Sequence, residues 1–265
     1  MQIANEYNHL NAREFLLVNR EAQYNEILQS IKNIDANQFL KISCDKSKLG
    51  KVFYSQSDIN RAIKTALYAE GWKERRIEYY VTADERITRE IINITNKEKQ
   101  KEHLNKEGVV YYSTFNQVDF QKERVAVEVQ FGKYFSVAYD LHVKHTFFYS
   151  RNDIDVGIEV IPTKAMEEHM DTGVPWYENE VTNVIREGRT NPPVPILILG
   201  IEPEMILSNE PIDFTDEDLI NILKNSNIIK LRNKIKEEEN RGALLGIKKQ
   251  RIEKIKKCLE KMEET

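Results

Sequence analysis

The fold of this chain is decided by one stretch near its middle, Asp119-Phe120-Gln121-Lys122-Glu123-Arg124-Val125-Ala126-Val127-Glu128-Val129-Gln130-Phe131. After a polar tip, the second half of the stretch alternates Val and Phe with Ala, Glu and Gln, as a β-strand does. Alternate side chains of a strand share one face, so Glu128 and Gln130 point to one side of the sheet and the valines to the other. If the segments on either side of the tip pair as a hairpin, Asp119 lies beside Glu128.

A pair of carboxylates at such a hairpin is one pattern that indicates a cation-binding site. Two carboxylates brought together on a buried sheet repel each other unless a cation lies between them. Magnesium suits that place because it is bound by one or two carboxylates, with water and phosphate oxygens completing its shell. The pattern also fits a hairpin whose polar residues face water, since antiparallel sheets often have one solvated face. The stretch by itself leaves both interpretations open.

Composition sets the protein class. The chain has 265 residues, 40% of them hydrophobic, which allows one large domain or two small ones with a sizeable core. A net charge of -4 does not exclude nucleic-acid binding, which depends on where the charges lie. Two distant cysteines, Cys44 and Cys258, predict neither a disulfide framework nor a zinc site. We expect His142 and His145 to be satisfied or solvent-facing rather than metal ligands. With no membrane-spanning apolar run and no signal-peptide pattern, we expect a cytoplasmic protein.

The remaining patterns predict an α/β core. Strand-like runs stand in the middle of the chain, over residues 109–115, 125–131, 156–162 and 194–201, with a short strand or helix end at 39–42. Apolar residues at helical spacing predict helices over residues 13–33, from a cap at Ser57 or Asp58 to Gly71, and over 176–187, 215–225 and 227–262. The highly charged residues 84–106 predict a partly exposed helix or a mobile excursion. Strands between helical ends favour a sheet covered by helices.

Several ordered motifs carry a resemblance to a known family. They are Tyr7-Asn8-His9, Ser43-Cys44-Asp45-Lys46-Ser47-Lys48-Leu49-Gly50, Gly71-Trp72-Lys73, Val118-Asp119-Phe120, Val127-Glu128-Val129-Gln130-Phe131, Asp153-Ile154-Asp155, Thr163-Lys164 and Val194-Pro195-Ile196. In this order and spacing the chain resembles the type II restriction endonucleases of the BglII/BstYI family. The resemblance covers about residues 5–72 and 109–201.

The resemblance implies a fold and an activity. The fold is the PD-(D/E)XK nuclease core, a central mixed β-sheet flanked by helices, here with a helical insertion and a helical C-terminal tail. The activity is Mg²⁺-dependent hydrolysis of both strands of a short palindromic, GATC-centred double-stranded DNA site by a homodimer, giving 5′-phosphates and staggered ends. Such an enzyme works in a restriction-modification system beside a cognate methyltransferase, with which we expect no direct contact, and without a membrane.

The resemblance also assigns the catalytic residues. It makes Asp119 and Glu128 metal ligands and the backbone carbonyl of Val129 a further ligand. Most such nucleases carry a lysine two positions after the second acid, whereas this family has a glutamine, here Gln130. An amide does not titrate usefully, so we expect Gln130 to orient the attacking water rather than to act as a general base.

Candidate DNA contacts fall in two regions. Lys133 stands where the family contacts a base, and Asp171, Thr172 and Gly173 lie in a loop that matches the base-reading loop in length, although Gly173 replaces a polar residue. Asp accepts from cytosine, Thr donates or touches a thymine methyl, and Lys donates to guanine or meets a phosphate. Ser47 and Lys48 are candidates for phosphate contacts, which position the protein without specifying sequence. A plain surface loop and solvated lysines are the alternatives.

We expect residues 1–265 to form a single restriction-endonuclease domain. Its parts are an N-terminal helical part (1–72), a charged insertion (73–108), the catalytic sheet core (109–201) and a helical extension (202–265). The insertion either reaches around DNA or is a solvated helix, and the extension either aids dimer packing or flanks the DNA. Two other functions stay open: a DNA-binding, nicking or repair protein on the same scaffold, and an interaction protein whose acids are solvated.

Overall fold

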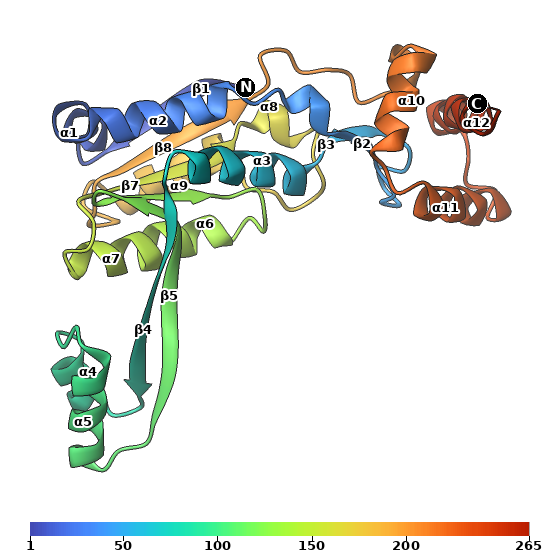
Figure 1. The fold of residues 1–265 in the computed structure, drawn as a ribbon. Helices are drawn as coiled ribbons and strands as arrows, with labels where there is room; N and C mark the ends of the chain where they lie inside the picture. Colours follow the sequence, from blue (N-terminus) through green and yellow to red (C-terminus); the bar gives the residue numbers. More distant parts are fainter. Residues whose placement is uncertain (265) are drawn as a thin grey trace.

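A mixed six-stranded sheet forms the body of the protein in the computed structural model, which describes residues 1–264. In spatial order its strands are β1 (Gln2–His9), β8 (Ile196–Glu202), β7 (Val156–Pro162), β6 (Val125–Val129), β5 (Tyr111–Lys122) and β4 (Lys73–Thr82) (Figure 1). The central strands β6, β7 and β8 are parallel, and the outer pairings are antiparallel. The mixed sheet flanked by helices that we expected is therefore present.

The predicted hairpin joins β5 to β6 through a tight turn. Phe120 pairs with Val127, and only Glu123 and Arg124 connect the strands. Both connecting residues have positive φ, 44° and 69°, as a two-residue type I′ turn requires. The Arg124 guanidinium holds the turn by donating to both carboxylate oxygens of Asp155, at 2.6 and 2.9 Å. The strand β6 ends at Val129, two residues before the predicted end.

Helices cover both faces of the sheet. One face, which includes Val127 and Val129, packs in the main core against α1 (Ala12–Asn19), α2 (Glu21–Lys32) and α3 (Gln56–Ala69). The other face packs against α6 (Ser136–Tyr139), the π-helical turn η2 (Asp140–His145), α7 (Thr146–Ser150) and α9 (Tyr177–Glu187). Figure 1 shows α3 and α6 on opposite sides of the strands. Glu128 lies on the side of η2, because its neighbours along the strand face the other way.

Two sequence predictions were wrong in detail, and some elements were missed. The predicted helix over residues 13–33 is two helices that meet at Arg20, whose side chain bonds to the Glu123 carbonyl and to Asp155 instead of continuing a helical face. The helix α3 begins at Gln56, so that Ser55 rather than Ser57 or Asp58 occupies the N-cap position. The strand β1 and the helical segment from Ser136 to Ser150 were not predicted.

The strands β4 and β5 extend well past the body and carry a small helical unit at their end (Figure 1). This unit comprises α4 (Glu85–Ile91) and α5 (Lys97–Glu107), which bury Ile87, Ile91 and Leu104 between them. The Gln100 side chain ties the unit to the strands by donating to the carbonyls of Ile91 and Ile94 and accepting from the Tyr80 amide. The charged segment 84–106 is thus two ordered helices on an arm, which we define as α4, α5 and the parts of β4 and β5 that project beyond the body.

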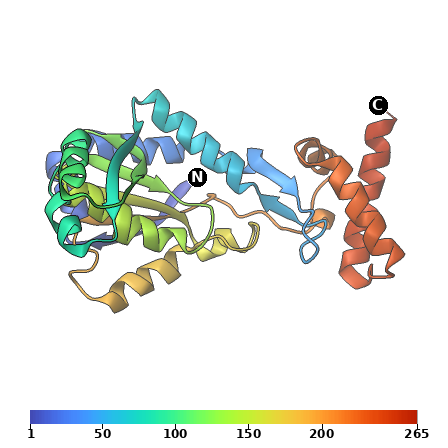
Figure 2. The ribbon, with the colours of Figure 1, turned by 90° about the horizontal axis from the view of Figure 1, so that it is seen from below.

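The C-terminal region contains three helices, α10 (Asp216–Lys224), α11 (Ile228–Asn240) and α12 (Gly246–Glu263). Figure 2 shows them beyond the small hairpin of β2 (Leu40–Ile42) and β3 (Val52–Tyr54). Buried Arg251 of α12 fixes the region by donating to Glu210 at 2.7 Å and to the Leu49 carbonyl at 3.0 Å. The segment 227–262 is helical as predicted, as two helices separated near Gly242, which has a positive φ of 64°.

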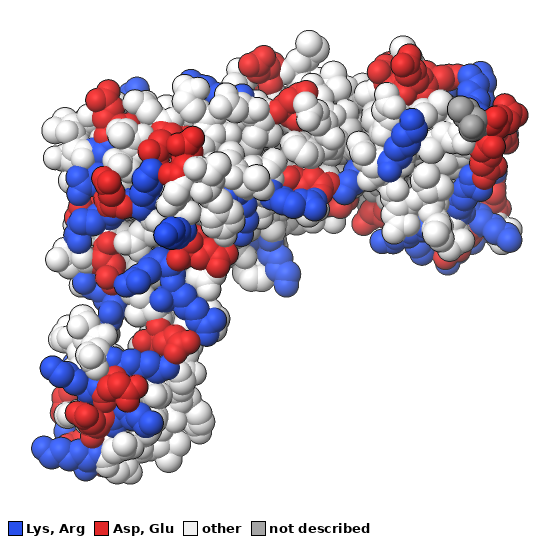
Figure 3. All heavy atoms as spheres, in the orientation of Figure 1, with Lys and Arg blue, Asp and Glu red and all other residues white. Residues whose placement is uncertain are grey.

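The overall shape is bent. Figure 3 shows the body and the arm bordering a wide hollow, with Lys and Arg side chains interspersed with Asp and Glu along its edge. Among residues 1–264, no helix has the length and apolar character needed to cross a membrane. Cys44 and Cys258 are both free thiols.

Candidate active site

The hairpin brings the two predicted metal ligands together. Continuing the pairing of Phe120 with Val127 by one residue sets Asp119 opposite Glu128. The Val129 amide lies 3.4 Å from Asp119 Oδ2, which places this carboxylate at the end of β6. The Glu128 side chain is 2% exposed and that of Asp119 is 25% exposed. Since Glu128 is buried, the alternative of a hairpin with solvated acids is wrong for this residue.

Glu128 lies in a strongly electronegative, water-poor environment. Burial, followed by the negative charges of Asp140 and Asp119, raises the pKa of Glu128 well above its usual value, against the opposing charge of Lys144. Within the part of the chain that the structure describes, Glu128 Oε1 is buried and has no hydrogen-bond partner. A buried carboxylate oxygen without a partner is costly. A bound cation would relieve both the missing contact and the repulsion.

The donor set fits a divalent cation that keeps several waters. No group of three or more His, Cys, Asp or Glu side chains among residues 1–264 is arranged to hold a metal ion. Magnesium does not need such a group, because it is commonly held by one or two carboxylates together with water and phosphate. The pair Asp119 and Glu128 meets that lower requirement. The Val129 carbonyl as a further ligand stays a prediction.

Gln130 is held at both ends of its amide. Its Nε2 donates to Asp140 Oδ2 at 3.0 Å, and its Oε1 accepts from the Gly132 amide at 2.9 Å. A carbonyl oxygen has a second lone pair, so Oε1 retains capacity to accept from a water. The fixed amide is compatible with the predicted role in orienting the attacking water, and that role stays a prediction.

Two residues beside Glu128 were missed from the sequence. The π-helical turn η2 presents Asp140, which is 1% exposed, and Lys144, whose Nζ lies 2.7 Å from Asp140 Oδ1 and 3.1 Å from Glu128 Oε2. Burial lowers the pKa of Lys144, but the charges of Glu128 and Asp140 outweigh it and raise the pKa above its usual value. The spacing Asp140–Lys144 was a usable signal, since residues four apart meet on one helical face.

A buried pair lies behind this cluster. Glu159 of β7 is aligned with Glu128 in the sheet, and His145 Nε2 lies 3.5 Å from Glu159 Oε2. Neither side chain has a hydrogen-bond partner among the described residues. Burial, and next the charge of Lys144, lower the pKa of His145 to about 3. The prediction of a satisfied or solvent-facing histidine is therefore wrong for His145, whereas His142 lies 2.9 Å from Glu187.

The candidate DNA-contact residues gather near the carboxyl ends of β6 and β7. The Tyr134 amide donates to the Gly173 carbonyl at 2.8 Å, which joins the segment of Lys133 to the loop of Asp171, Thr172 and Gly173. Lys133, Thr172 and Gly173 are exposed, and Asp171 is half-buried. The loop therefore lies beside the strand that carries Glu128. Its contacts with bases stay predictions.

Ser47 and Lys48 lie at the same end of the body but are engaged within the protein. The Ser47 backbone and hydroxyl both donate to Asp45 Oδ1, at 2.8 and 2.7 Å. The Lys48 ammonium donates to the Met170 carbonyl, next to Asp171. The structure thus brings Lys48 next to the candidate base-reading loop, while Ser47 is held by Asp45. Their predicted phosphate contacts remain untested.

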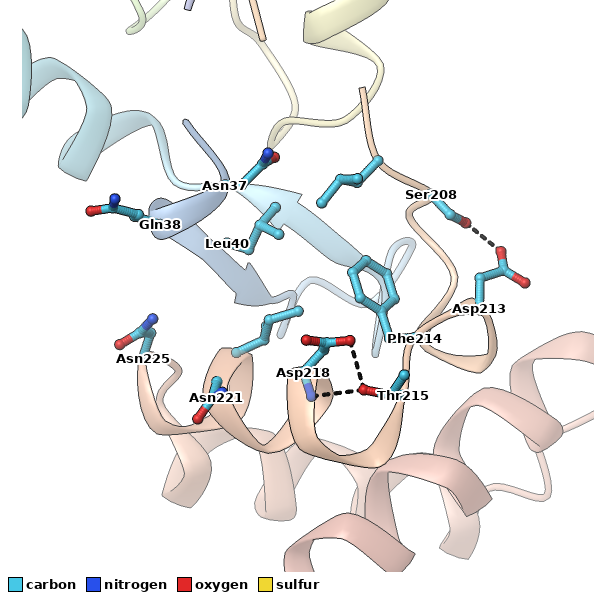
Figure 4. Close-up of a pocket in the computed structure, with 12 residues that line it drawn as sticks. Asn37, Gln38, Leu40, Ser208, Asp213, Phe214, Thr215, Asp218, Asn221 and Asn225 are labelled. Atoms are coloured by element: carbon cyan, nitrogen blue, oxygen red, sulfur yellow. Dashed lines mark hydrogen bonds between the residues drawn. The ribbon is translucent and has the colours of Figure 1, made fainter. Parts of the chain in front are cut away.

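Two cavities differ in their relation to these residues. One of about 290 Å³ is lined by Asp119, Asn116, Tyr139 and Lys144, so it opens onto the Asp119 carboxylate and onto the lysine that contacts Glu128. Another of about 520 Å³ lies between β2 and α10 (Figure 4) and contains none of the candidate catalytic residues. Its acids are already partnered, as Figure 4 shows for Asp213 with Ser208 and Asp218 with Thr215. The smaller cavity is the candidate active site.

Comparison with known proteins identifies the family. The family model described as restriction endonuclease BglII/BglIII matches residues 4–201, three quarters of the chain. The chain belongs to the BglII/BglIII family of restriction endonucleases. The family predicted from the ordered motifs is therefore confirmed, and with it the assignment as a type II restriction endonuclease.

The solved structure of BglII bound to DNA shares the fold. Restriction endonuclease BglII complexed with a DNA 16-mer matches with a TM-score of 0.52 and 18% identity, over 76% of this chain and 78% of that chain. Free BglII matches with a TM-score of 0.47 and 15% identity, over 77% and 81%. No curated protein matches this chain. At 18% identity the likeness to the DNA complex concerns the fold alone, and it confirms the predicted fold class.

Proposed function

We propose that this chain forms a homodimer that cuts both strands of a short palindromic, GATC-centred double-stranded DNA site in the presence of Mg²⁺, leaving 5′-phosphates and staggered ends. The observation that carries the proposal is the pairing of Asp119 with buried Glu128, whose Oε1 has no partner among the described residues. The segment of Lys133, which follows β6, is hydrogen-bonded to the loop of Asp171. We further propose that residues 1–265 act as one domain in the cytoplasm, with a cognate methyltransferase that they do not contact.

Each residue of the candidate active site has a separate role in hydrolysis. Asp119 and Glu128 would hold the magnesium ion, which when bound would supply positive charge for water activation and for the phosphate. Gln130 Oε1 accepts a hydrogen bond from the attacking water and so orients it. The new bond joins the water oxygen to phosphorus while the bond from phosphorus to O3′ breaks. The water proton passes to solvent or to a phosphate oxygen, and O3′ takes a proton as it leaves.

The DNA-contact residues divide into two groups. Lys133, Asp171 and Thr172 meet base edges, where each side chain has a hydrogen-bonding partner in the major groove. Gly173 exposes backbone rather than a side chain, so specificity at the outer base pairs comes from elsewhere in the loop. Ser47 and Lys48 meet phosphates and set the register of the protein on the duplex.

A plasmid digest followed by sequencing of the DNA ends tests the proposal. With Mg²⁺ the wild-type protein should give discrete fragments whose ends read one palindromic site. Glu128→Ala should lose cleavage by about 1000-fold or more because the buried ligand is gone, yet retain specific binding. Glu98→Gln, which changes an exposed acid on the arm, is the matched control and should cut as wild type does.

Other results would reject the proposal. Nicked circles or smears from the wild-type protein would favour a nicking or repair enzyme on the same scaffold. Cleavage by Glu128→Ala at the wild-type rate would remove the metal site from this hairpin.

A further inference from the structure

A lysine from outside the sheet enters the candidate active site. The Lys144 ammonium lies 3.1 Å from Glu128 Oε2 and 2.7 Å from Asp140 Oδ1. Its side chain is 21% exposed and lines the same cavity as Asp119. The ammonium is therefore held by buried carboxylates on one side and open to the cavity on the other.

The local structure is built to keep that position. A π-helical turn widens the helix between α6 and α7, and such turns are rare and often found at functional sites. The turn is pressed against the sheet at Gly157, where a Cβ atom would lie 2.5 Å from His145 Nδ1. Only a residue without a side chain allows this approach. Lys144, the neighbour of His145, is thereby fixed against Glu128 rather than left on a flexible surface helix.

A cation at this point has a chemical task that Gln130 cannot perform. Negative charge accumulates on the phosphate oxygens during phosphodiester hydrolysis, and positioned lysine or arginine side chains stabilise it. The amide of Gln130 is neutral, and its Nε2 already donates to Asp140. Lysine binds phosphate as a compact point charge.

We propose that Lys144 is a catalytic residue whose ammonium contacts a non-bridging oxygen of the scissile phosphate, and that Asp140 is the positioning residue for both Lys144 and Gln130. This inference rests on the proposed nuclease function. It assigns to an element outside the hairpin the positive charge that the Asp119–Glu128–Gln130 pattern lacks. Asp140 links the two, because its Oδ1 faces Lys144 and its Oδ2 accepts from Gln130.

Lys64 offers a comparison within the same molecule. It reaches Asp119 Oδ1 at 3.4 Å from α3, on the opposite face of the sheet, and its side chain is 31% exposed. It makes one longer contact, whereas Lys144 makes two shorter ones to buried carboxylates. A variant of Lys64 therefore separates a general effect of removing positive charge near Asp119 from the specific effect of Lys144.

The first experiment measures single-turnover cleavage and DNA affinity of Lys144→Gln, Lys144→Arg and Lys64→Gln. Lys144→Gln should cut about 100-fold more slowly at saturating Mg²⁺, the size expected for one lost contact to transition-state charge. Lys144→Arg should recover at least about tenfold of that loss, since it keeps the charge. Without metal, Lys144→Gln should also bind cognate DNA about tenfold more weakly, because the phosphate then faces three carboxylates without their counter-charge. Lys64→Gln should show a smaller loss in each assay.

A second experiment distinguishes a phosphate contact from a purely structural role. A stereospecific phosphorothioate at the scissile position replaces one non-bridging oxygen, and one diastereomer should slow the wild-type enzyme. If Lys144 contacts that oxygen, the slowing should shrink in Lys144→Gln and persist in Lys64→Gln. Should Lys144→Gln fail to fold, Lys144→Arg is compared with wild type on the same substrates.

The outcomes separate this inference from the proposed function. If the wild-type protein does not cut, the proposed function fails. If the wild type cuts while Lys144→Gln cuts within about threefold of it, or shows an unchanged phosphorothioate effect for both diastereomers, only the assignment of Lys144 is overturned.

Discussion

Asp119 lies opposite Glu128 on the neighbouring strand of the sheet, whereas Lys144 contacts Glu128 from a helical turn that packs on the sheet. The hairpin that carries Asp119 is set by strand register, which the alternating valines specify. The π-helical turn that carries Lys144 is set by packing, through the approach of His145 to Gly157. The metal-ligand pair therefore depends on local hydrogen bonding within the sheet, and the position of the Lys144 ammonium depends on the packing of a helical turn against β7. The two regions should respond differently to mutation.

Among the variants that test this comparison, we expect the largest loss of cleavage from Asp140→Ala. It leaves the hairpin intact but removes the acceptor of both Gln130 and Lys144, so the water-orienting amide and the ammonium lose their anchor together. We expect single-turnover cleavage to fall by about 100-fold while metal-dependent DNA binding remains. Asp213→Asn, an exposed acid beside the distant cavity, is the control. Wild-type cleavage by Asp140→Ala would show that the hairpin works without the π-helical turn.

The hairpin was predictable because its signals are local. The alternating run from Val125 placed Glu128 and Gln130 on one side, and Asp140 does join them, since it accepts from Gln130 and shares Lys144 with Glu128. The turn was less evident, because Glu123 and Arg124 lack the Asn-Gly signature of a type I′ turn and rely on Asp155 for support. A polar tip between two strand-like runs was still enough to place it.

The π-helical segment could not be found in the same way. Its wider turn shifts the apolar spacing away from the 3.6-residue period, so the segment from Ser136 to Ser150 showed no clear helical pattern. The strand β4 was missed for a different reason. Its residues are mostly exposed, with charges where a half-buried strand would alternate, so it lacks the pattern of burial. Long-range packing and solvent-exposed pairing leave weak traces in a single sequence.

A middle-sized effect is expected from Gly157→Ala. The new Cβ would lie 2.5 Å from His145 Nδ1, so the π-helical turn must move away from β7. Overpacking of this kind costs about 1–3 kcal/mol, measurable by denaturant unfolding. Cleavage should fall as well, because Lys144 moves with the turn. Gly188→Ala adds a Cβ with no atom within 4 Å but at a φ of 96°, so it should lower stability through backbone strain without the same loss of cleavage.

If Gly157→Ala were as stable and as active as wild type, the turn would not depend on close approach to the sheet. If it lost stability but kept full activity, Lys144 would not depend on the position of the turn. Either result would weaken the contrast between the two regions.

The smallest expected effect is the loss of stability at acidic pH that arises from His145. His145 is fully buried, and burial lowers its pKa to about 3, so the folded protein keeps it neutral where an unfolded histidine takes up a proton. Between about pH 6.5 and pH 3 the unfolded state binds more protons, and stability falls as the pH falls through that window. Glu159 acts in the opposite direction: burial raises its pKa well above the usual value, so its contribution to stability grows as the pH falls from its pKa in the folded protein toward that usual value. Lowering the pH from 7.5 to 5.5 should reduce the free energy of unfolding by about 1 kcal/mol through His145. His145→Gln should remove this contribution, whereas His142→Gln should retain it. The measurement is denaturant unfolding of the wild type, His145→Gln and His142→Gln at both pH values. An equal change in stability in all three proteins would mean that His145 does not gain a proton on unfolding, and the assignment of a neutral, buried His145 would be wrong.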